Sequence, residues 1–285
     1  MNPSIVSAFV AMLCYGVSDF IYKRAAAASI RADHFLMAQA WFFCPLVIVY
    51  ALATGTLVLA PAALWGALAG AFVFIGFYYF VRSLATGAVS TNASIFRLNF
   101  IVTAVLAIAL LGEPVTRPKL VGLAFALLAT WLLVGTGGSA DRVPSDARRR
   151  SLAQVGFATL AFGASNFFHT VGLRHGAVPE TLAVAQAAVF MPLATVVVYV
   201  ADRKLAPPPL TFKFGIVSAV VLLAATIFLL RSVAHGQASI LVPIAQMGFI
   251  IAALLGIVVL RERLTRRKAI GLVSALAALA ALAAS

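Results

Sequence analysis

Long apolar stretches alternate with short polar connections along the whole chain. Ten of these stretches have about the length, near 20 residues, that a helix needs to cross the ~30 Å hydrocarbon layer of a membrane. They cover residues 4–22, 35–54, 62–81, 89–111, 119–135, 152–173, 181–201, 214–230, 238–260 and 269–284. The pattern predicts an all-α membrane protein with ten transmembrane helices. Thr116 and Thr265 precede the fifth and tenth stretches as expected helix N-caps.

One segment of the chain occurs twice. Residues 82–122 align without a gap with residues 231–271, which lie 149 positions later. The matched pairs include Arg82 with Arg231, Gly87 with Gly236, Phe100 with Phe249, Glu113 with Glu262, Thr116 with Thr265, Lys119 with Lys268 and Gly122 with Gly271. Such a series of charged and small residues predicts an internal duplication.

The duplication extends to the beginning of each half. Residues 15–20 align with residues 162–167 at an offset of 147. Each half is then a unit of five helices, and because five is odd the second unit must enter the membrane from the opposite side. The expected fold is two inverted five-helix repeats around a central cavity. We expect the first repeat at residues 1–136, a cytoplasmic linker at 137–151 and the second repeat at 152–285.

Composition supports the membrane assignment. Of the 285 residues, 63% are apolar and 10% are charged, and the mean hydropathy is +1.07. A soluble domain has about 25% charged residues. No cleavable signal peptide is evident, because the first apolar stretch is about 20 residues long and lacks a basic start.

The positive charge indicates an orientation rather than a nucleic-acid partner. The net charge is +13, and sixteen Lys and Arg residues fall in the connections after odd-numbered stretches, against four on the other side. The positive-inside rule then places both termini outside the cytoplasm. We expect a multi-pass protein of the bacterial plasma (inner) membrane.

Several chemistries lack their sequence signals. No phosphate-binding loop, nucleophile triad or metal-ligand spacing occurs, and Cys14 and Cys44 lie singly within apolar stretches. We therefore expect no enzyme activity, no cofactor and no metal site. Glu113 and Glu262 end their stretches beside basic residues, where we expect them to cap helices or form loop ion pairs.

Two closing motifs and the odd-numbered repeat resemble a known transporter family. The motifs are Gly112-Glu113-Pro114-Val115-Thr116…Gly122 and Arg261-Glu262-Arg263-Leu264-Thr265…Gly271. With the aromatic-Gly-x-Ser opening of the first and sixth stretches, they resemble the ten-span EamA type of the drug/metabolite transporter (DMT) superfamily. Within it, the overall pattern is similar to the bacterial amino-acid exporters called YddG. That resemblance implies export of amino acids, aromatic ones included, from a cavity lined by spans 1, 3, 4, 6, 8 and 9.

Two ionisable residues lie within apolar stretches, where charges are costly and therefore functional candidates. Asp19 and Arg97 lie about 6 Å and 12 Å from the cytoplasmic ends of their spans at a rise of 1.5 Å per residue. Their repeat counterparts are Asn166 and Gln246. We interpret Asp19 and Arg97 as a gate that closes the cytoplasmic side and favours an outward-facing resting state. The alternative is a static pair that satisfies two buried charges.

Other polar and aromatic residues are candidates for the cavity lining. Following the resemblance, we favour Tyr78, Tyr79, Asn92, Asn99, Asn166, His169 and Gln246. Each can equally bond one helix to another. Phe77, Tyr78 and Tyr79 are candidates for stacking on an apolar substrate. Gln39 and Gln186 belong to the second and seventh spans, which we expect to be peripheral.

The sequence thus predicts a secondary transporter that exports small metabolites, most of all amino acids, by alternating access. The expected partners are a small-molecule substrate and the lipid bilayer, not nucleic acid, and the expected functional state is a monomer. Two alternatives stay open at this point. One is a multidrug exporter of the same fold, and the other is an intramembrane enzyme acting on lipid.

Overall fold

The computed structural model describes residues 2–86, 89–133, 145–260 and 265–285, and regular structure in these ranges is entirely helical. The α-helices are α1 (Pro3–Ala27), α2 (Ala32–Ala53), α3 (Leu64–Thr86), α4 (Val89–Arg97), α5 (Asn99–Leu111), α6 (Arg117–Leu133), α7 (Ser145–Arg174), α8 (Pro179–Asp202), α9 (Pro209–Ala234), α10 (Ala238–Gln246), α11 (Phe249–Leu260) and α12 (Arg266–Ala283). A short 3₁₀ helix, Pro61–Ala63, leads into α3. The predicted all-α fold is confirmed.

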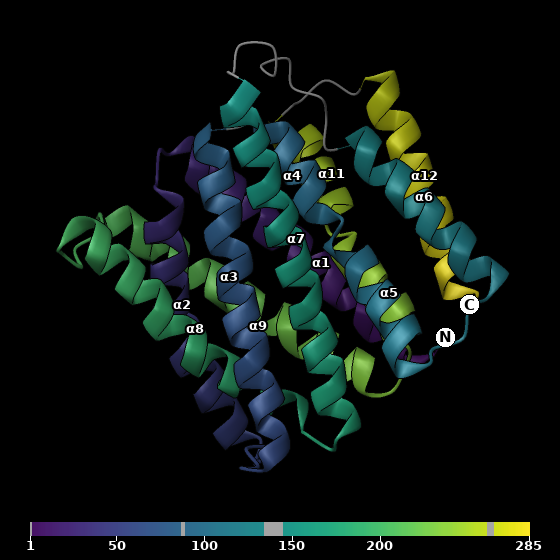
Figure 1. The fold of residues 1–285 in the computed structure, drawn as a ribbon, viewed down its shortest axis with the longest axis horizontal. Helices are drawn as coiled ribbons and strands as arrows, with labels where there is room; N and C mark the ends of the chain where they lie inside the picture. Colours follow the sequence, from purple (N-terminus) through teal and green to yellow (C-terminus); the bar gives the residue numbers. More distant parts are fainter. Residues whose placement is uncertain (1, 87–88, 134–144, 261–264) are drawn as a thin grey trace.

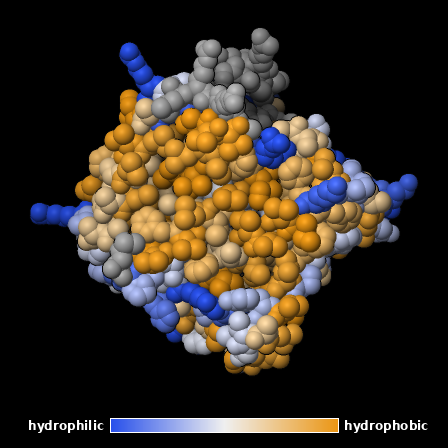
Figure 2. Space-filling model, turned by 180° about the vertical axis from the view of Figure 1, so that it is seen from behind, coloured by the Kyte–Doolittle hydropathy of each residue, from blue (hydrophilic) through white to orange (hydrophobic). Residues whose placement is uncertain are grey.

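Six helices of the described residues are long and apolar enough to cross a membrane. They are Pro3–Ala27, Ala32–Ala53, Pro61–Leu84, Pro179–Asp202, Pro209–Ala234 and Ala238–Val259. The space-filling view shows a broad apolar surface with hydrophilic groups around its margin (Figure 2). Such an apolar surface suits lipid tails, and the chain is a multi-pass membrane protein.

The expected linker between the halves, residues 137–151, is described only in part. Residues 137–144 of the expected linker lie outside the described residues, and so does the Arg261-Glu262-Arg263 motif. Residues 145–151 are already the first two turns of α7. Asp146 in the first turn complements the positive end of the helix dipole, which favours an early helix start.

Two of the ten apolar stretches are broken helices. The first breaks at Leu98, between α4 and α5, where the Leu98 N–H donates to the Ile95 carbonyl in a tight turn. The second breaks after Gln246, where the Met247 N–H donates to the Pro243 and Ile244 carbonyls. Pro243 has no N–H and weakens the helix there. Arg97 and Gln246, which are repeat counterparts, are the last residues before the two breaks.

Helices of the two halves pack in matched pairs (Figure 1). The first helix of each half packs against the third span of the other, as α1 with α9 and α7 with α3. The second span of each half packs against the third span of the other, as α2 with α9 and α8 with α3. The helices α2 and α8, and α6 and α12, pack against their own counterparts, and α5 packs against α10 of the other half. The pairs between the first three spans of one half and those of the other are therefore preserved when the halves are exchanged.

The pair α6 and α12 runs antiparallel at one edge of the molecule (Figure 1). A Cβ added at Gly122, near the start of α6, would lie 2.7 Å from Leu282 Cγ at the end of α12. A Cβ added at Gly271, near the start of α12, would lie 2.7 Å from Leu133 Cγ at the end of α6. Thr116 and Thr265 each accept the N–H three residues on at 3.3 Å, so both predicted N-caps are confirmed.

Matching glycines bring the first helix of each half against a helix break. A Cβ at Gly16 of α1 would lie 2.4 Å from Ile251 Cβ, and one at Gly163 of α7 would lie 2.5 Å from Val102 Cβ. Both glycines and both β-branched partners are repeat counterparts. These close approaches hold the broken helices around the centre of the molecule, where the cavity lies.

Candidate functional site

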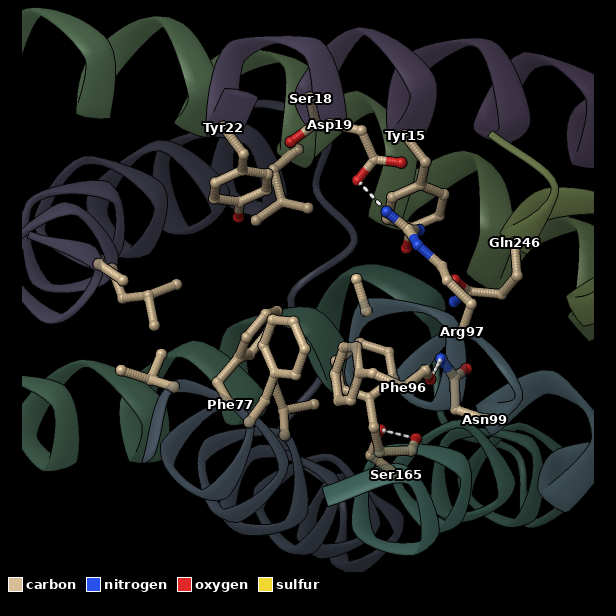
Figure 3. A pocket seen from close by; sticks show the side chains of 18 of the residues that line it. Tyr15, Ser18, Asp19, Tyr22, Phe77, Phe96, Arg97, Asn99, Ser165 and Gln246 are labelled. Atoms are coloured by element: carbon tan, nitrogen blue, oxygen red, sulfur yellow. Dashed lines mark hydrogen bonds and ion pairs between the residues drawn. The ribbon is translucent and has the colours of Figure 1, made fainter. Parts of the chain in front are cut away.

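A cavity of about 360 Å³ lies among α1, α2, α3, α4, α5, α7, α8, α9 and α10. It has a polar wall along α1 and an aromatic wall across from it (Figure 3). The residues of α1 that line it are Tyr15, Ser18, Asp19, Tyr22, Ala25 and Ala26. Most of these recur at intervals of three or four residues, which places them on one face of the helix.

Asp19 and Arg97 form an ion pair in this cavity, with 2.6 Å between Arg97 Nη2 and Asp19 Oδ1. Figure 3 shows the two side chains reaching toward each other from α1 and from the end of α4. Their side chains are 17% and 24% exposed, respectively. The pair brings two opposite charges to the cavity wall in a setting with little solvent, where their attraction is strong.

Four polar atoms on the cavity wall have no hydrogen-bond partner within the described parts of the chain. They are Ser18 Oγ, Asp19 Oδ2, Asn99 Oδ1 and His169 Nε2. The Asn99 amide nitrogen donates to the Phe96 carbonyl at 2.8 Å, which leaves its oxygen as an acceptor toward the cavity. Each of the four atoms can accept a hydrogen bond. Because an unpaired buried polar atom costs ~1–3 kcal/mol, these atoms suit a polar ligand.

The opposite wall is aromatic. Phe77, Phe80, Phe96 and Phe162 all line the cavity. Their ring centroids are close: 5.3 Å separates Phe77 from Phe162, 5.2 Å separates Phe96 from Phe162, and 4.3 Å separates Phe80 from Phe96. This cluster offers ring faces and edges to an aromatic or apolar group.

The cavity reaches the surface at one end. Among its lining residues only Ala26 and Ala32, beside the turn between α1 and α2, are exposed. At the other end Leu229 and Leu230 are 4% and 2% exposed. The cavity continues past Asp19 to this turn while the Asp19–Arg97 pair is formed. The ion pair therefore borders the cavity and does not seal that end.

Four of the seven predicted lining residues lie on the cavity wall, namely Asn99, Asn166, His169 and Gln246. The other three do not. Tyr78 accepts a hydrogen bond from Arg82 at 2.8 Å, and Tyr79 packs edge-on against Phe157. Asn92 donates to the carbonyl and the hydroxyl of Ser83 and to the Ser151 hydroxyl.

Helix periodicity explains these corrections. Phe77 faces the cavity, and each following residue is rotated by about 100° around the helix axis. Tyr78 and Tyr79 are thereby turned away from the cavity, and Phe80 and Val81 return to it. Asn92 is not part of the cavity wall, because its amide ties α4 to α3 and α7.

Several lining residues are additional to the predicted set. Ser18, Tyr15 and Tyr22 share the α1 face with Asp19, and the spacing 15, 18, 19, 22 was a usable signal for that face. Gln186 was expected to be peripheral, yet it borders the cavity from α8. Thr226 of α9 also lines the cavity. It carries neither a charge nor an aromatic ring, so nothing in the sequence marked it as a lining residue.

No group of three His, Cys, Asp or Glu side chains that could hold a metal ion occurs in the described residues. Cys14 and Cys44 are unpaired thiols in α1 and α2.

Comparison with known proteins places the first half of the chain with a transporter family. Residues 2–135 match the model of the EamA-like transporter family, which is just under half of the chain. One solved structure, described only as the crystal structure of a protein, superposes with a TM-score of 0.78 at 14% sequence identity. The superposition covers 98% of this chain and 95% of that one. No curated protein matches the chain.

At this low identity the structural likeness shows a shared fold and nothing more. The family match is the functional clue, and it indicates a membrane transporter of small molecules.

Proposed function

We propose that the protein is a secondary transporter that exports small zwitterionic metabolites, foremost amino acids with aromatic or apolar side chains, by alternating access. One observation carries this proposal: the cavity joins an Asp19–Arg97 pair to a wall of phenylalanine rings. An amino acid has an ammonium group for the free oxygen of Asp19 and a carboxylate for the guanidinium of Arg97. Its side chain can rest on the aromatic wall.

The matched packing of the halves supports alternating access. We assign the first repeat to residues 1–136, the linker to 137–151 and the second repeat to 152–285. The antiparallel α6 and α12, and the matched pairs that the first three spans form between the halves, support an inverted relation between these repeats. Two such units can rock about a central site, so that it opens to one face at a time.

Asp19 and Arg97 act in this proposal as an inner gate that senses the substrate. A bound ammonium or carboxylate competes with the ion pair, which couples occupancy of the cavity to the position of α1 relative to α4. The repeat counterparts Asn166 and Gln246 also line the cavity and provide the weaker, uncharged version of the same gate.

The proposed orientation rests on the positive-inside rule. We place both termini outside the cytoplasm, in a bacterial inner membrane, and take the monomer as the functional unit. In this orientation the exposed turn between α1 and α2 faces the cytoplasm. The cavity is then open inward, which differs from the outward-facing resting state expected for a closed Asp19–Arg97 gate.

Export of cationic drugs is a second candidate. The unpartnered Asp19 Oδ2 beside aromatic rings is a suitable site for an organic cation. A drug exporter would bind the cation without needing a carboxylate on the substrate, and so without needing Arg97.

The deciding experiment uses purified protein in liposomes preloaded with unlabelled phenylalanine, and follows counterflow of labelled phenylalanine. We expect uptake of labelled phenylalanine. Unlabelled phenylalanine or leucine outside the liposomes should suppress this uptake, and a cationic dye should not. Suppression by the dye alone would favour the drug exporter, and absence of any counterflow would refute amino-acid transport.

A further inference from the structure

We infer that Asp33 and Arg82 form a second ion pair that closes the cavity mouth when the transporter opens to its other face. This inference rests on the alternating access proposed above. It assigns a role to two charged residues that lie outside the cavity. It is based on a difference in bonding: an ion pair is formed at one end of the molecule, and the equivalent residues at the other end are not paired with each other.

An ion pair already locks the closed end. Arg231 Nη2 lies 2.5 Å from Glu180 Oε1, and Arg231 Nε lies 2.9 Å from the same oxygen. The Glu180 side chain is 2% exposed, and Arg231 also donates to the Tyr50 hydroxyl at 3.1 Å. This pair fastens the start of α8 to the end of α9, and these two helices pack together.

The duplication places the same charges at the other end. Arg82 corresponds to Arg231 at the offset of 149, and Asp33 corresponds to Glu180 at the offset of 147. Asp33 is the second residue of α2, as Glu180 is the second residue of α8. Arg82 lies in the last turns of α3, as Arg231 does in α9.

In the structure these counterparts are bonded to near neighbours instead. Arg82 donates to the Tyr78 hydroxyl one turn earlier, with its guanidinium carbon 5.4 Å from the Tyr78 ring centroid. Asp33 Oδ2 lies 2.5 Å from Arg31 Nη2. Within the described residues, Asp33 and Arg82 are not bonded to each other. Both line one groove of about 580 Å³ among α2, α3 and α8.

This groove adjoins the cavity mouth. Ala32, Leu36 and Phe77 line both spaces, and Val81 of α3 does so as well. Over the described chain, α2 and α3 make almost no contact with each other, whereas their counterparts α8 and α9 pack together. The open end is thus the place where the equivalent of the Arg231–Glu180 contact is not made.

Closure of the cavity mouth requires only that Asp33 and Arg82 exchange their present hydrogen-bond partners for each other. Arg31 keeps its two hydrogen bonds to Asp202, at 2.8 and 3.1 Å, when Asp33 turns to Arg82. Arg82 exchanges a neutral hydroxyl for a carboxylate, which is a stronger partner. In that state α2 and α3 pack together as α8 and α9 do in the present structure. The Arg231–Glu180 pair opens at the same time, so the two halves exchange their arrangements.

The test is a cysteine pair, Asp33→Cys with Arg82→Cys, in a Cys14→Ala/Cys44→Ala background, because the chain has only two cysteines. The protein is reconstituted in liposomes and oxidised with copper phenanthroline, with and without phenylalanine. We expect crosslinking that increases with phenylalanine, at least tenfold loss of counterflow on crosslinking, and recovery on reduction. The matched pair Glu180→Cys with Arg231→Cys should crosslink most without phenylalanine.

Two outcomes would overturn the gate. One is that the cysteines introduced at positions 33 and 82 never crosslink, and the other is a crosslink that leaves counterflow unchanged, in each case with active parent protein. Absence of counterflow in the parent would instead refute the proposed function. The charge swap Asp33→Arg with Arg82→Asp gives an independent measure. It should restore counterflow that each single change lowers by about two- to fivefold, as expected for an exposed pair.

Discussion

The two ends of the molecule are built from matching residues but are bonded differently. At the closed end the buried Glu113 carboxylate accepts the Ala238 and Ser239 N–H groups, each at 2.9 Å, and pairs with Arg174 at 3.2 Å. Lys119, which is fully buried, donates to Gln237 and Ser239 at 2.7 and 2.8 Å.

At the open end, the described ion pairs are more exposed to solvent than the Glu113 and Lys119 interactions. Arg31 is half exposed where it binds Asp202, and Arg82 bonds within its own helix. The comparison teaches that one sequence unit supports two arrangements, a locked one and a loosened one. Under the proposed alternating access, each half takes each arrangement in turn. The predictions below test this difference.

Removal of the Glu113 interactions at the closed end should have the largest effect on stability. Glu113→Ala removes a carboxylate that is 5% exposed and leaves two α10 N–H groups without their acceptor. We expect a loss of ~3 kcal/mol in stability, as for other buried charged groups that lose a partner. Thermal unfolding in detergent measures it. The exposed acid Asp146, changed to Ala, is the control and should lower stability by less than ~1 kcal/mol, the size of a helix-dipole interaction.

Breaking the central pair should affect transport more than stability. Asp19→Asn and Arg97→Gln each remove one charge from the cavity, and we expect each to lower phenylalanine counterflow at least tenfold. The double change Asp19→Arg with Arg97→Asp should restore part of the loss if the pairing itself matters. Asp146→Asn and Arg148→Gln make the same substitutions at exposed sites of α7 and should leave counterflow unchanged. Single variants with full counterflow would remove the pair from the mechanism.

The matched glycines test whether the halves are equivalent in packing. Gly16→Ala and Gly163→Ala each place a methyl within 2.5 Å of a β-branched side chain. We expect similar losses of ~1–3 kcal/mol from overpacking. Gly156→Ala is the control, because its added Cβ meets nothing within 4 Å. A large loss at only one of the two matched positions would contradict equivalent packing.

The exposed network at the open end should have the smallest effect. Asp202→Asn weakens its bonds to Arg31 and His34, which join α2 to α8. The hydrogen bonds that Arg31 donates to Asp33, and next to Asp202, raise the pKa of Arg31, so this arginine stays charged at every working pH. We expect the smallest shift of this set in thermal unfolding, because the pair is solvent-exposed. A loss as large as that of Glu113→Ala would mean that the two ends are equally locked.

Sequence patterns identified the helices well, because apolar stretches of membrane length and N-caps such as Thr116 are local properties. The break at Leu98 was not predicted, since it depends on packing against Gly163 of α7, whereas Pro243 is a local signal for the break after Gln246. Intramembrane charge led to the Asp19–Arg97 pair, which lies in the cavity.

The other residues of the cavity wall were harder to predict, because the sequence does not show which way each side chain points. Tyr78 and Tyr79 have suitable chemistry but point away from the cavity, whereas Phe77 and Phe80 on the same helix point into it. Gln186 belongs to a span expected to be peripheral. Both errors concern the face that a helix turns toward the cavity. Packing against neighbouring helices sets this rotation, and the local sequence does not.

The central claim is that the two ends exchange their arrangements. It is tested most directly by spin-label distances in nanodiscs, between positions 33 and 82 at one end and between 180 and 231 at the other. Addition of phenylalanine should shorten the first distance and lengthen the second in the same molecules. Distances that both stay fixed, while the labelled protein still exchanges phenylalanine in liposomes, would contradict the account.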